Sequence, residues 1–179
     1  MLIRTAAIAQ ERAKEKRRNK QPGWMFDELI AMTFAALSIE ALCNSIGDRI
    51  IEDWDKDFES ASPNAKLRIL AKRLDIRYDK DKDPWVGARE LAKFRNLVAH
   101  AKPQLVIEEK EMNQEQYDRR LFEVPQSKLE RLVTAANADR AVRTVEQLKD
   151  LLIKKLEPEQ KLGLSVDGWS GSVRLHNDA

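Results

Sequence analysis

The chain contains little cysteine, glycine or proline. A single Cys43 among 179 residues excludes an intramolecular disulfide framework and a cysteine-rich zinc site, so nothing points to secretion and a cytoplasmic location is expected. Six glycines form no glycine-rich phosphate loop, and no zinc-ligand spacing or serine nucleophile elbow occurs. β-Branched residues are few beside the many Ala, Leu, Lys, Arg and Glu. This composition favours an all-α fold and offers no site for a cofactor or metal.

The charge is unevenly distributed along the chain. The total is +2, yet residues 1–22 hold seven Lys or Arg against two Glu, a local charge of +5 that leaves −3 for the remainder. The apolar LIRTAAIAQ precedes the basic ERAKEKRRNK, the reverse of the order in a secretory signal, so no signal peptide is expected. The basic segment has few aromatic residues and is at most a nonspecific electrostatic arm.

The longest apolar run, LIAMTFAALSIEALCNSI, has one charge in eighteen residues. A spanning helix needs about twenty apolar residues, and Glu40 with Asn44 near mid-membrane would cost a few kcal/mol, so a buried bundle helix is preferred over a membrane span. Apolar residues cover two opposite faces of this helix, which predicts burial on both sides. With so few helices in the chain, one face is expected to meet a second copy, giving a homodimer. The two faces are Met32, Ala35, Ala36, Ile39, Cys43, Ile46 and Ile50 on one side, and Ile30, Phe34, Leu37 and Ala41 on the other.

The six prolines stand where the apolar periodicity stops or restarts, and they mark element boundaries. Helices are predicted over residues 4–20, 24–53, 63–74, 84–102 and 127–156, the last with AANAD as a candidate break. Their caps are Ser62, Asp83 and the capping box of Ser127 with Glu130. The segments QLVIEEKEM and RRLFEV, separated by polar NQEQYD, suggest a small β-hairpin insertion. The expected fold is a helical bundle of about four to five helices with that insertion.

These boundaries divide the chain into three segments. Residues 1–22 form a basic N-terminal helix or arm, residues 23–156 a helical domain, and residues 157–179 a flexible C-terminal tail with three of the six glycines. The tail is read as largely disordered or as a docking segment around Trp169.

The stretch KFRNLVAHAKP closes the helix that precedes Pro103, and it places an arginine, an amide and one of the two histidines together. On a helical wheel Leu91, Phe94 and Val98 define the core face and Arg95 lies at its shoulder. A guanidinium half inside an apolar face needs an anionic partner, and Glu40, the one acid within the apolar run, is the candidate. The opposite side of the helix carries Arg89, Lys93, Asn96 and His100. On the wheel the directions of Arg95 and His100 differ by roughly 140°. Both side chains therefore reach one ligand only if the arginine bends or the last turn is distorted.

His100 is expected in that last turn, where the helix dipole favours its protonated form and suits it to acid–base chemistry near neutral pH. Through FRNLVAH the sequence resembles the HEPN superfamily, whose motif is an arginine followed, after four to six residues, by a histidine. Arg95, Asn96 and His100 match it, and MTFAALSIEALCNSIGDRI resembles the apolar helix that often precedes it. The resemblance covers residues 24 to 156 of the chain.

The resemblance implies a dimer that cleaves RNA without a metal, with the two motifs facing each other. The ribose 2′-hydroxyl would attack the neighbouring phosphate, with His100 as base or acid, Arg95 as phosphate clamp and Asn96 as orienter. Arg89, Lys93 and Lys102 would add attraction for phosphates, and residues 12–20 would extend it along the strand. Many members of the superfamily act in toxin–antitoxin or defence systems, so an antitoxin or another protein is an expected partner.

Other interpretations of the same residues remain open. Many members of the superfamily are non-catalytic scaffolds that bind a protein or nucleic acid, and an unrelated helical domain would use Arg95 only as a salt bridge between helices. His100 would then be a plain helix C-cap, and Lys93 and Arg89 part of a solvated face. DKDKDPWVGARE imitates a calcium loop, but Pro84 stands where the turn demands glycine and lysines alternate with the acids, which argues against calcium.

Overall fold

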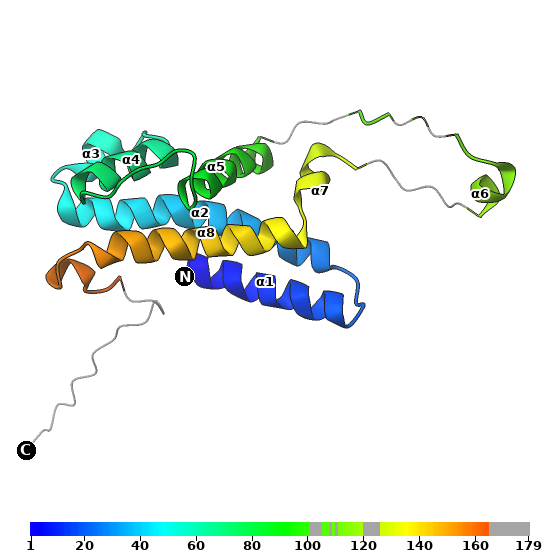
Figure 1. The fold of residues 1–179 in the computed structure, drawn as a ribbon, viewed down its shortest axis with the longest axis horizontal. Coiled ribbons are helices and arrows are strands. Elements are labelled where there is room, and N and C mark those ends of the chain that lie inside the picture. Colours follow the sequence, from blue (N-terminus) through cyan, green and yellow to red (C-terminus); the bar gives the residue numbers. More distant parts are fainter. Residues whose placement is uncertain (101–104, 108, 110, 120–125, 165–179) are drawn as a thin grey trace, which may run out of the picture.

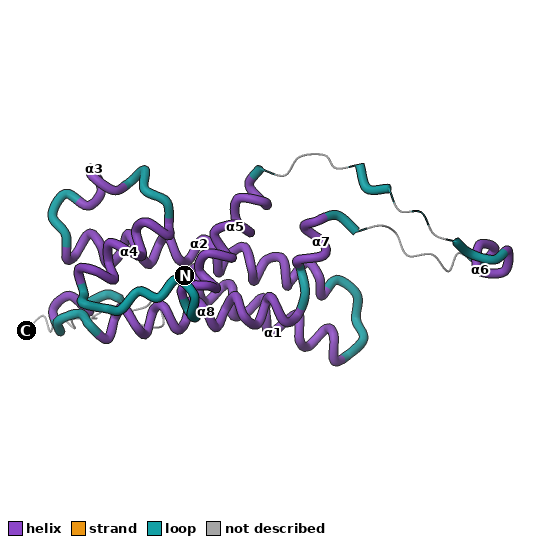
Figure 2. Tube along the Cα trace, turned by 45° about the horizontal axis from the view of Figure 1, so that its top comes forward, coloured by secondary structure: helices purple, strands orange, loops and turns teal. Residues whose placement is uncertain are grey.

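A computed structural model of the chain describes residues 1–100, 105–107, 109, 111–119 and 126–164. Throughout this described part the regular structure is helical and contains no strand (Figure 2). The expectation of an all-α fold is therefore confirmed. The helices are α1 (Leu2–Arg18), α2 (Trp24–Ile50), α3 (Trp54–Phe58), α4 (Pro63–Arg73), α5 (Trp85–Ala99), α6 (Gln114–Asp118), α7 (Lys128–Leu132) and α8 (Ala135–Lys154), followed by a 3₁₀ turn, η1 (Glu159–Lys161).

Helix α2 is the centre of the bundle. It runs beside α8, with α1 on one side of this pair and α4 and α5 on the other (Figures 1 and 2). Ala31, Ala35, Ile39, Cys43 and Ile46 recur every three or four residues and are almost completely buried. This spacing places them on one face of the helix, and the core forms around that face.

The length and composition of α2 would also allow it to span a membrane. The core helix of a globular protein satisfies the same test, and half of the most apolar eighteen-residue window of α2 is buried within the chain. The burial supports the core role that the sequence predicts for this helix.

Helix α1 packs along α2 and also contacts α8. Its buried positions are Ala6, Ala9, Gln10 and Ala13, and the small alanine side chains let the two backbones approach closely. The predicted basic helix at the N-terminus is therefore a packed helix of the bundle rather than a separate arm.

The predicted start of α4 matches the observed one, and the predicted start of α5 differs from it by one residue. The hydroxyl of Ser62 accepts a hydrogen bond from the Ala65 N–H at the start of α4. The Asp83 carboxylate accepts one from the Gly87 N–H at 3.1 Å, although Trp85 is the first residue of α5. Helix α2 ends at Ile50 rather than near residue 53. The short α3 that follows it is not among the predicted helices.

The segment predicted to hold a β-hairpin contains a short helix between the two predicted strands, and the hairpin itself is not confirmed. The polar NQEQYD forms α6, closed by a capping box of Asn113 and Gln116, and Figure 1 shows it well apart from the bundle. Residues 104, 108, 110 and 120–124, which belong to the two predicted strands, lie outside the described residues.

The C-terminal helix is interrupted earlier than predicted. The capping box of Ser127 and Glu130 is confirmed at the start of α7, and the backbone hydrogen bond from Ser127 lowers the pKa of Glu130. The break falls at Val133 and Thr134, ahead of AANAD, because the Thr134 hydroxyl accepts from the Asn137 N–H and starts α8 afresh.

Beyond α8 the chain turns back onto the bundle as far as residue 164. Leu156 is buried, and the Leu162 carbonyl accepts a hydrogen bond from the Arg49 guanidinium at 3.3 Å, next to the end of α2. The predicted docking segment around Trp169 lies outside the described residues.

Candidate functional site

Helix α5 presents the motif residues as the helical wheel predicts. Leu91 and Phe94 are buried and Val98 is half-buried, so this face packs into the bundle. Arg95, at the shoulder of that face, has a side chain that is 39% exposed. Helix α5 therefore holds the guanidinium half inside the protein, which requires a partner for its charge.

The partner of Arg95 is Glu40, as the sequence predicts. The Arg95 Nη2 lies 3.6 Å from the Glu40 Oε2, and the Glu40 side chain is 31% exposed. This ion pair joins α5 to α2 at the edge of the core. A partly exposed pair of this kind contributes about 1 kcal/mol, so its structural role alone is modest.

A second cation, Lys66 of α4, binds the other oxygen of Glu40. Its Nζ lies 3.5 Å from the Glu40 Oε1, and only 1% of the Lys66 side chain is exposed. The same ammonium donates to the Asn44 Oδ1 at 3.0 Å and to the Glu59 carbonyl at 3.2 Å. The ammonium thus has three oxygen partners, which compensate for the loss of its hydration shell.

Sequence reasoning missed Lys66 and the part that Asn44 plays in this cluster. The Asn44 Oδ1 also faces the Trp54 Nε1 at 3.4 Å, so one amide oxygen joins α2 to both α3 and α4. One signal was present: Lys66 precedes Leu70 by four residues, which places the lysine on the apolar face of α4. Here the name Glu40 cluster denotes Glu40, Asn44, Lys66 and Arg95.

Asn96 and His100 lie on the exposed side of α5, next to the cluster. The Arg95 Nη1 donates to the Asn96 Oδ1 at 3.3 Å, so the arginine and the amide of the motif are in contact. His100 is the C-cap of the helix, and its backbone N–H donates to the Asn96 carbonyl at 3.0 Å. Its imidazole is exposed, and no described residue forms a hydrogen bond with it, so it is accessible to a ligand.

The residues proposed to attract phosphate do not gather in one described patch. Arg89 is half-buried and Lys93 is exposed on α5, and Lys93 borders a cavity between α5, α7 and α8. Lys102 lies outside the described residues. The structure therefore brings together Arg95, Asn96 and Glu40, with His100 one turn further along.

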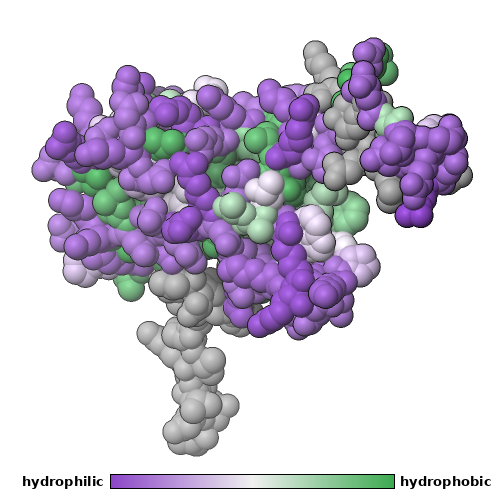
Figure 3. All heavy atoms as spheres, turned by 45° about the vertical axis from the view of Figure 1, so that its right-hand side comes forward, coloured by the Kyte–Doolittle hydropathy of each residue, from purple (hydrophilic) through white to green (hydrophobic). Residues whose placement is uncertain are grey.

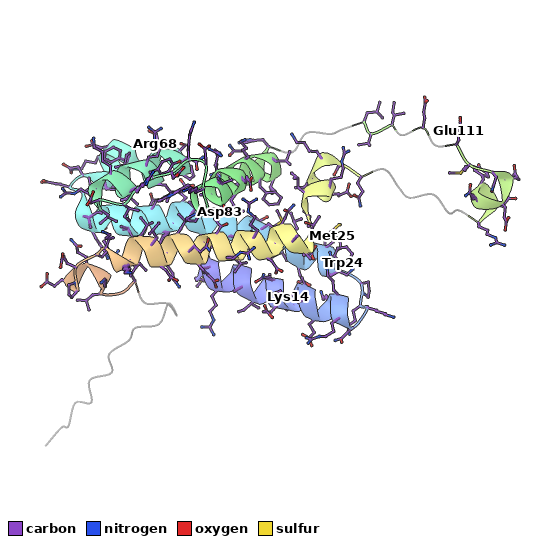
Figure 4. All side chains as sticks on the ribbon, in the orientation of Figure 1. Lys14, Trp24, Met25, Arg68, Asp83 and Glu111 are labelled. Carbon is purple, nitrogen blue, oxygen red and sulfur yellow. The ribbon has the colours of Figure 1, made fainter. Side chains whose placement is uncertain are left out.

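Several basic side chains of α1 are already paired with acids of the bundle. Arg12 and Lys16 contact the buried Asp27 carboxylate at 3.7 and 2.5 Å, and Arg17 contacts Glu28 at 2.6 Å. The Arg17 guanidinium also stacks over the Trp24 ring, 3.5 Å from its centroid. Figure 4 labels Trp24 at the start of α2 and Lys14 on α1. These pairs reduce the positive charge that residues 12–20 offer to a nucleic acid strand.

Cys43 lies inside the bundle beside the Glu40 cluster. Burial raises the pKa of its thiol to about 12, and the nearby Lys66 only partly offsets this effect. The thiol is therefore protonated at neutral pH, which argues against a role as a nucleophile.

Three of the four acids of the calcium-like loop contact cations of the chain. Asp79 lies 3.9 Å from Lys82, while Asp83 and Glu90 contact Arg140 of α8 at 3.2 and 2.6 Å. Figure 4 labels Asp83, which stands just before α5. Among the described residues no group of three or more His, Cys, Asp or Glu side chains is placed to hold a metal ion.

Comparison of the chain with models of known protein families, with curated proteins and with solved structures found no match.

Proposed function

We propose that the chain is a cytoplasmic, homodimeric ribonuclease of the HEPN type that cleaves RNA without a metal. The observation that supports this most is the contact between the Arg95 guanidinium and the Asn96 amide beside an exposed His100 imidazole. Together these groups supply a cation, an orienting amide and a group that transfers protons near neutral pH.

In the proposed reaction His100 removes the proton of a ribose 2′-hydroxyl, whose oxygen attacks the adjacent phosphorus. The bond from phosphorus to the 5′-oxygen breaks, and a second acid protonates this leaving oxygen. Arg95 stabilises the charge on the phosphoryl oxygens and Asn96 orients the phosphate. The products are a 2′,3′-cyclic phosphate and a 5′-hydroxyl.

The proposed dimer supplies that second acid as the partner's His100. Apolar residues of α2 leave an open stripe on the side away from the core, with Phe26 63% exposed, Ile30 38% exposed and Ala41 exposed. Phe34 and Leu37 on the same stripe are half-buried. The stripe borders Glu40, so a second copy packed there would lie next to Arg95.

The decisive experiment is cleavage of a single-stranded RNA by the purified chain in EDTA, with detection of cyclic-phosphate ends. His100→Ala should abolish cleavage, and His176→Ala, which changes the only other histidine, is the matched control and should leave cleavage intact. Cleavage that persists in His100→Ala would assign the activity elsewhere.

A second candidate is a non-catalytic HEPN-like dimer that binds an antitoxin, another protein or a nucleic acid. The 3.6 Å contact of Arg95 with Glu40 favours it, because a neutralised guanidinium attracts a phosphate less strongly. In this case RNA stays intact and a partner co-purifies with the chain. If Arg95 only joins two helices, Arg95→Ala should lower the melting temperature and His100→Ala should change little.

A further inference from the structure

A wedge-shaped cavity of about 440 Å³ lies on the flank of α5 away from the Glu40 cluster. Helices α5, α7 and α8 form its walls, with Met32 of α2 at the base. A volume of this size is within the range of about 300–1,000 Å³ that binds small organic molecules. We call this cavity the wedge; of the residues assigned to the proposed RNA site, Lys93 borders it.

The shape of the wedge follows from one close approach between two helices. A Cβ on Gly87 of α5 would overlap the Thr144 side chain of α8, so the two helices touch at that point. Towards the other end of α5 the helix diverges from α8, as Figures 1 and 2 show. The Asn137 Nδ2 donates to the Leu132 carbonyl at 2.8 Å, which fixes the end of α7 as the third wall. Contacts within the chain therefore set the shape of the wedge.

The walls of the wedge are mainly apolar. Leu91, Phe94 and Ala141 are buried at its base, while Leu97 is half-buried and Leu132 is 37% exposed nearer the mouth. Figure 3 shows apolar surface in separate patches between hydrophilic side chains. An apolar body in the wedge would remove this wall from water, which favours binding in proportion to the area covered.

Most of the charged groups at the mouth already have partners. The charged side chains that line it are Lys93, Lys128, Arg140 and Glu90, and Lys128 has an interaction partner of its own. Arg140 is already bound to Glu90 at 2.6 Å and to Asp83 at 3.2 Å, which holds it in place and neutralises it. The Lys93 ammonium, in contrast, pairs with none of the described residues and is exposed.

We infer that the wedge binds a small amphiphilic organic anion. The apolar body of the ligand would fill the space between Leu91, Phe94 and Leu132, and its single carboxylate or sulfonate would meet the Lys93 ammonium. The exposed Lys93 ammonium distinguishes this ligand from a neutral or cationic amphiphile of the same size.

The test uses the full chain with decanoate as probe, measured by displacement of the fluorescent anion 1-anilinonaphthalene-8-sulfonate below the micelle concentration. Decanoate should displace the dye. The size-matched decanol and decylammonium should bind at least about fivefold more weakly, since an exposed ion pair contributes up to about 1 kcal/mol. Equal competition by all three probes, or no displacement by decanoate, would overturn the inference.

Two variants locate the binding. Leu97→Trp should fill the mouth and weaken decanoate binding at least about tenfold, the loss expected when about 1.4 kcal/mol of apolar contact is removed. Lys93→Met keeps an apolar side chain of similar length and should weaken decanoate about fivefold while leaving decanol unchanged. Lys72→Met, an exposed lysine of α4 outside the wedge, is the matched control and should bind like wild type.

Helical circular dichroism and the melting temperature should be unchanged in these variants, because partly unfolded chains also bind the dye. If a folded Leu97→Trp variant binds decanoate as tightly as wild type does, the ligand is bound elsewhere and the inference is wrong. RNA cleavage is a separate measurement, so failure of the proposed function would leave this test unaffected.

Discussion

Replacing Glu40 by glutamine removes the only carboxylate that contacts the Lys66 ammonium in the described part of the chain. Lys66 is 1% exposed, so its charge has lost nearly all contact with water and depends on neighbouring oxygens. After the replacement the ammonium keeps the Asn44 Oδ1 at 3.0 Å and the Glu59 carbonyl at 3.2 Å. A buried cation would then remain without its counter-charge, which destabilises the folded state.

The expected loss of unfolding free energy for Glu40→Gln is about 2 kcal/mol. Breaking a fully buried ion pair costs roughly 3–5 kcal/mol. The loss here is smaller because Glu40 is 31% exposed and its distance to Lys66 is 3.5 Å. The two remaining oxygens also retain part of the stabilisation of the ammonium.

Lys66→Met should cost less than Glu40→Gln, about 1 kcal/mol or below. This variant removes the buried charge together with its desolvation penalty and fills the same space with an apolar side chain. Glu40 remains paired with Arg95. The double variant, Glu40→Gln with Lys66→Met, should then lose about 1 kcal/mol, because the stranded cation is gone.

The measurement is urea unfolding followed by circular dichroism for the two single variants and the double variant. Glu90→Gln provides a matched control, since Glu90 pairs with Arg140 at the surface and is 52% exposed, and it should cost no more than about 1 kcal/mol. The reasoning is refuted if Lys66→Met destabilises more than Glu40→Gln, or if the two single losses add up in the double variant.

Three further predictions concern other parts of the bundle. Gly47→Ala should destabilise by about 1–3 kcal/mol in urea unfolding despite the better helix propensity of alanine, because the added Cβ would overlap the Trp54 ring. Cys43 has a buried thiol with a pKa of about 12, so it should resist alkylation by iodoacetamide at pH 8 until the chain is unfolded. Mass spectrometry detects the alkylated chain, and fast alkylation of the native chain would contradict the prediction. Arg17→Ala should lower the unfolding free energy by about 2 kcal/mol, since it leaves the Glu28 carboxylate, 1% exposed, without its cation.

The raised pKa of Cys43 also predicts how stability depends on pH. The thiol has a pKa of about 9 in the unfolded chain and of about 12 in the folded chain. Between these two pH values the folded chain keeps the proton while the unfolded chain loses it. The free energy of unfolding is therefore unaffected by this group below pH 9 and falls as the pH rises towards about 12. In urea unfolding measured between pH 8 and pH 11, the free energy of unfolding of Cys43→Ala should fall less steeply with pH than that of wild type. An identical pH dependence in the variant would contradict the prediction.

The pairing of Arg95 with Glu40 could be predicted because each charge lies in an apolar helix and needs a partner. Glu40 is the single charge in the apolar run from Leu29 to Ile46, so the choice of acid was small. Lys66 was not found, since the sequence does not tell which helix packs against the Glu40 side of α2. The position of α4 across from Glu40 decides that Lys66 is buried.

The expected roles of the basic residues changed once the helices were placed. A charge count predicts a basic N-terminal segment, yet Arg12, Lys16 and Arg17 contact acids of α2 because α1 packs along that helix. Lys93 was predicted beside the motif, and in the structure it also borders the wedge on the other flank of α5. One residue on the exposed side of a helix can face either of two neighbouring grooves, and periodicity alone does not distinguish them.

The amino-acid sequence by itself determined the all-α class, the helix boundaries set by the capping residues, and the buried face of α2. These depend on local hydrogen bonding and on the spacing of apolar residues within one helix, which are properties of short segments. Only the tertiary structure decided the Glu40 cluster, the pairing of α1 with acids of α2, and the wedge between α5, α7 and α8. Each of these depends on which helices pack together and at what angle, because the charges and cavity walls come from residues far apart in the chain.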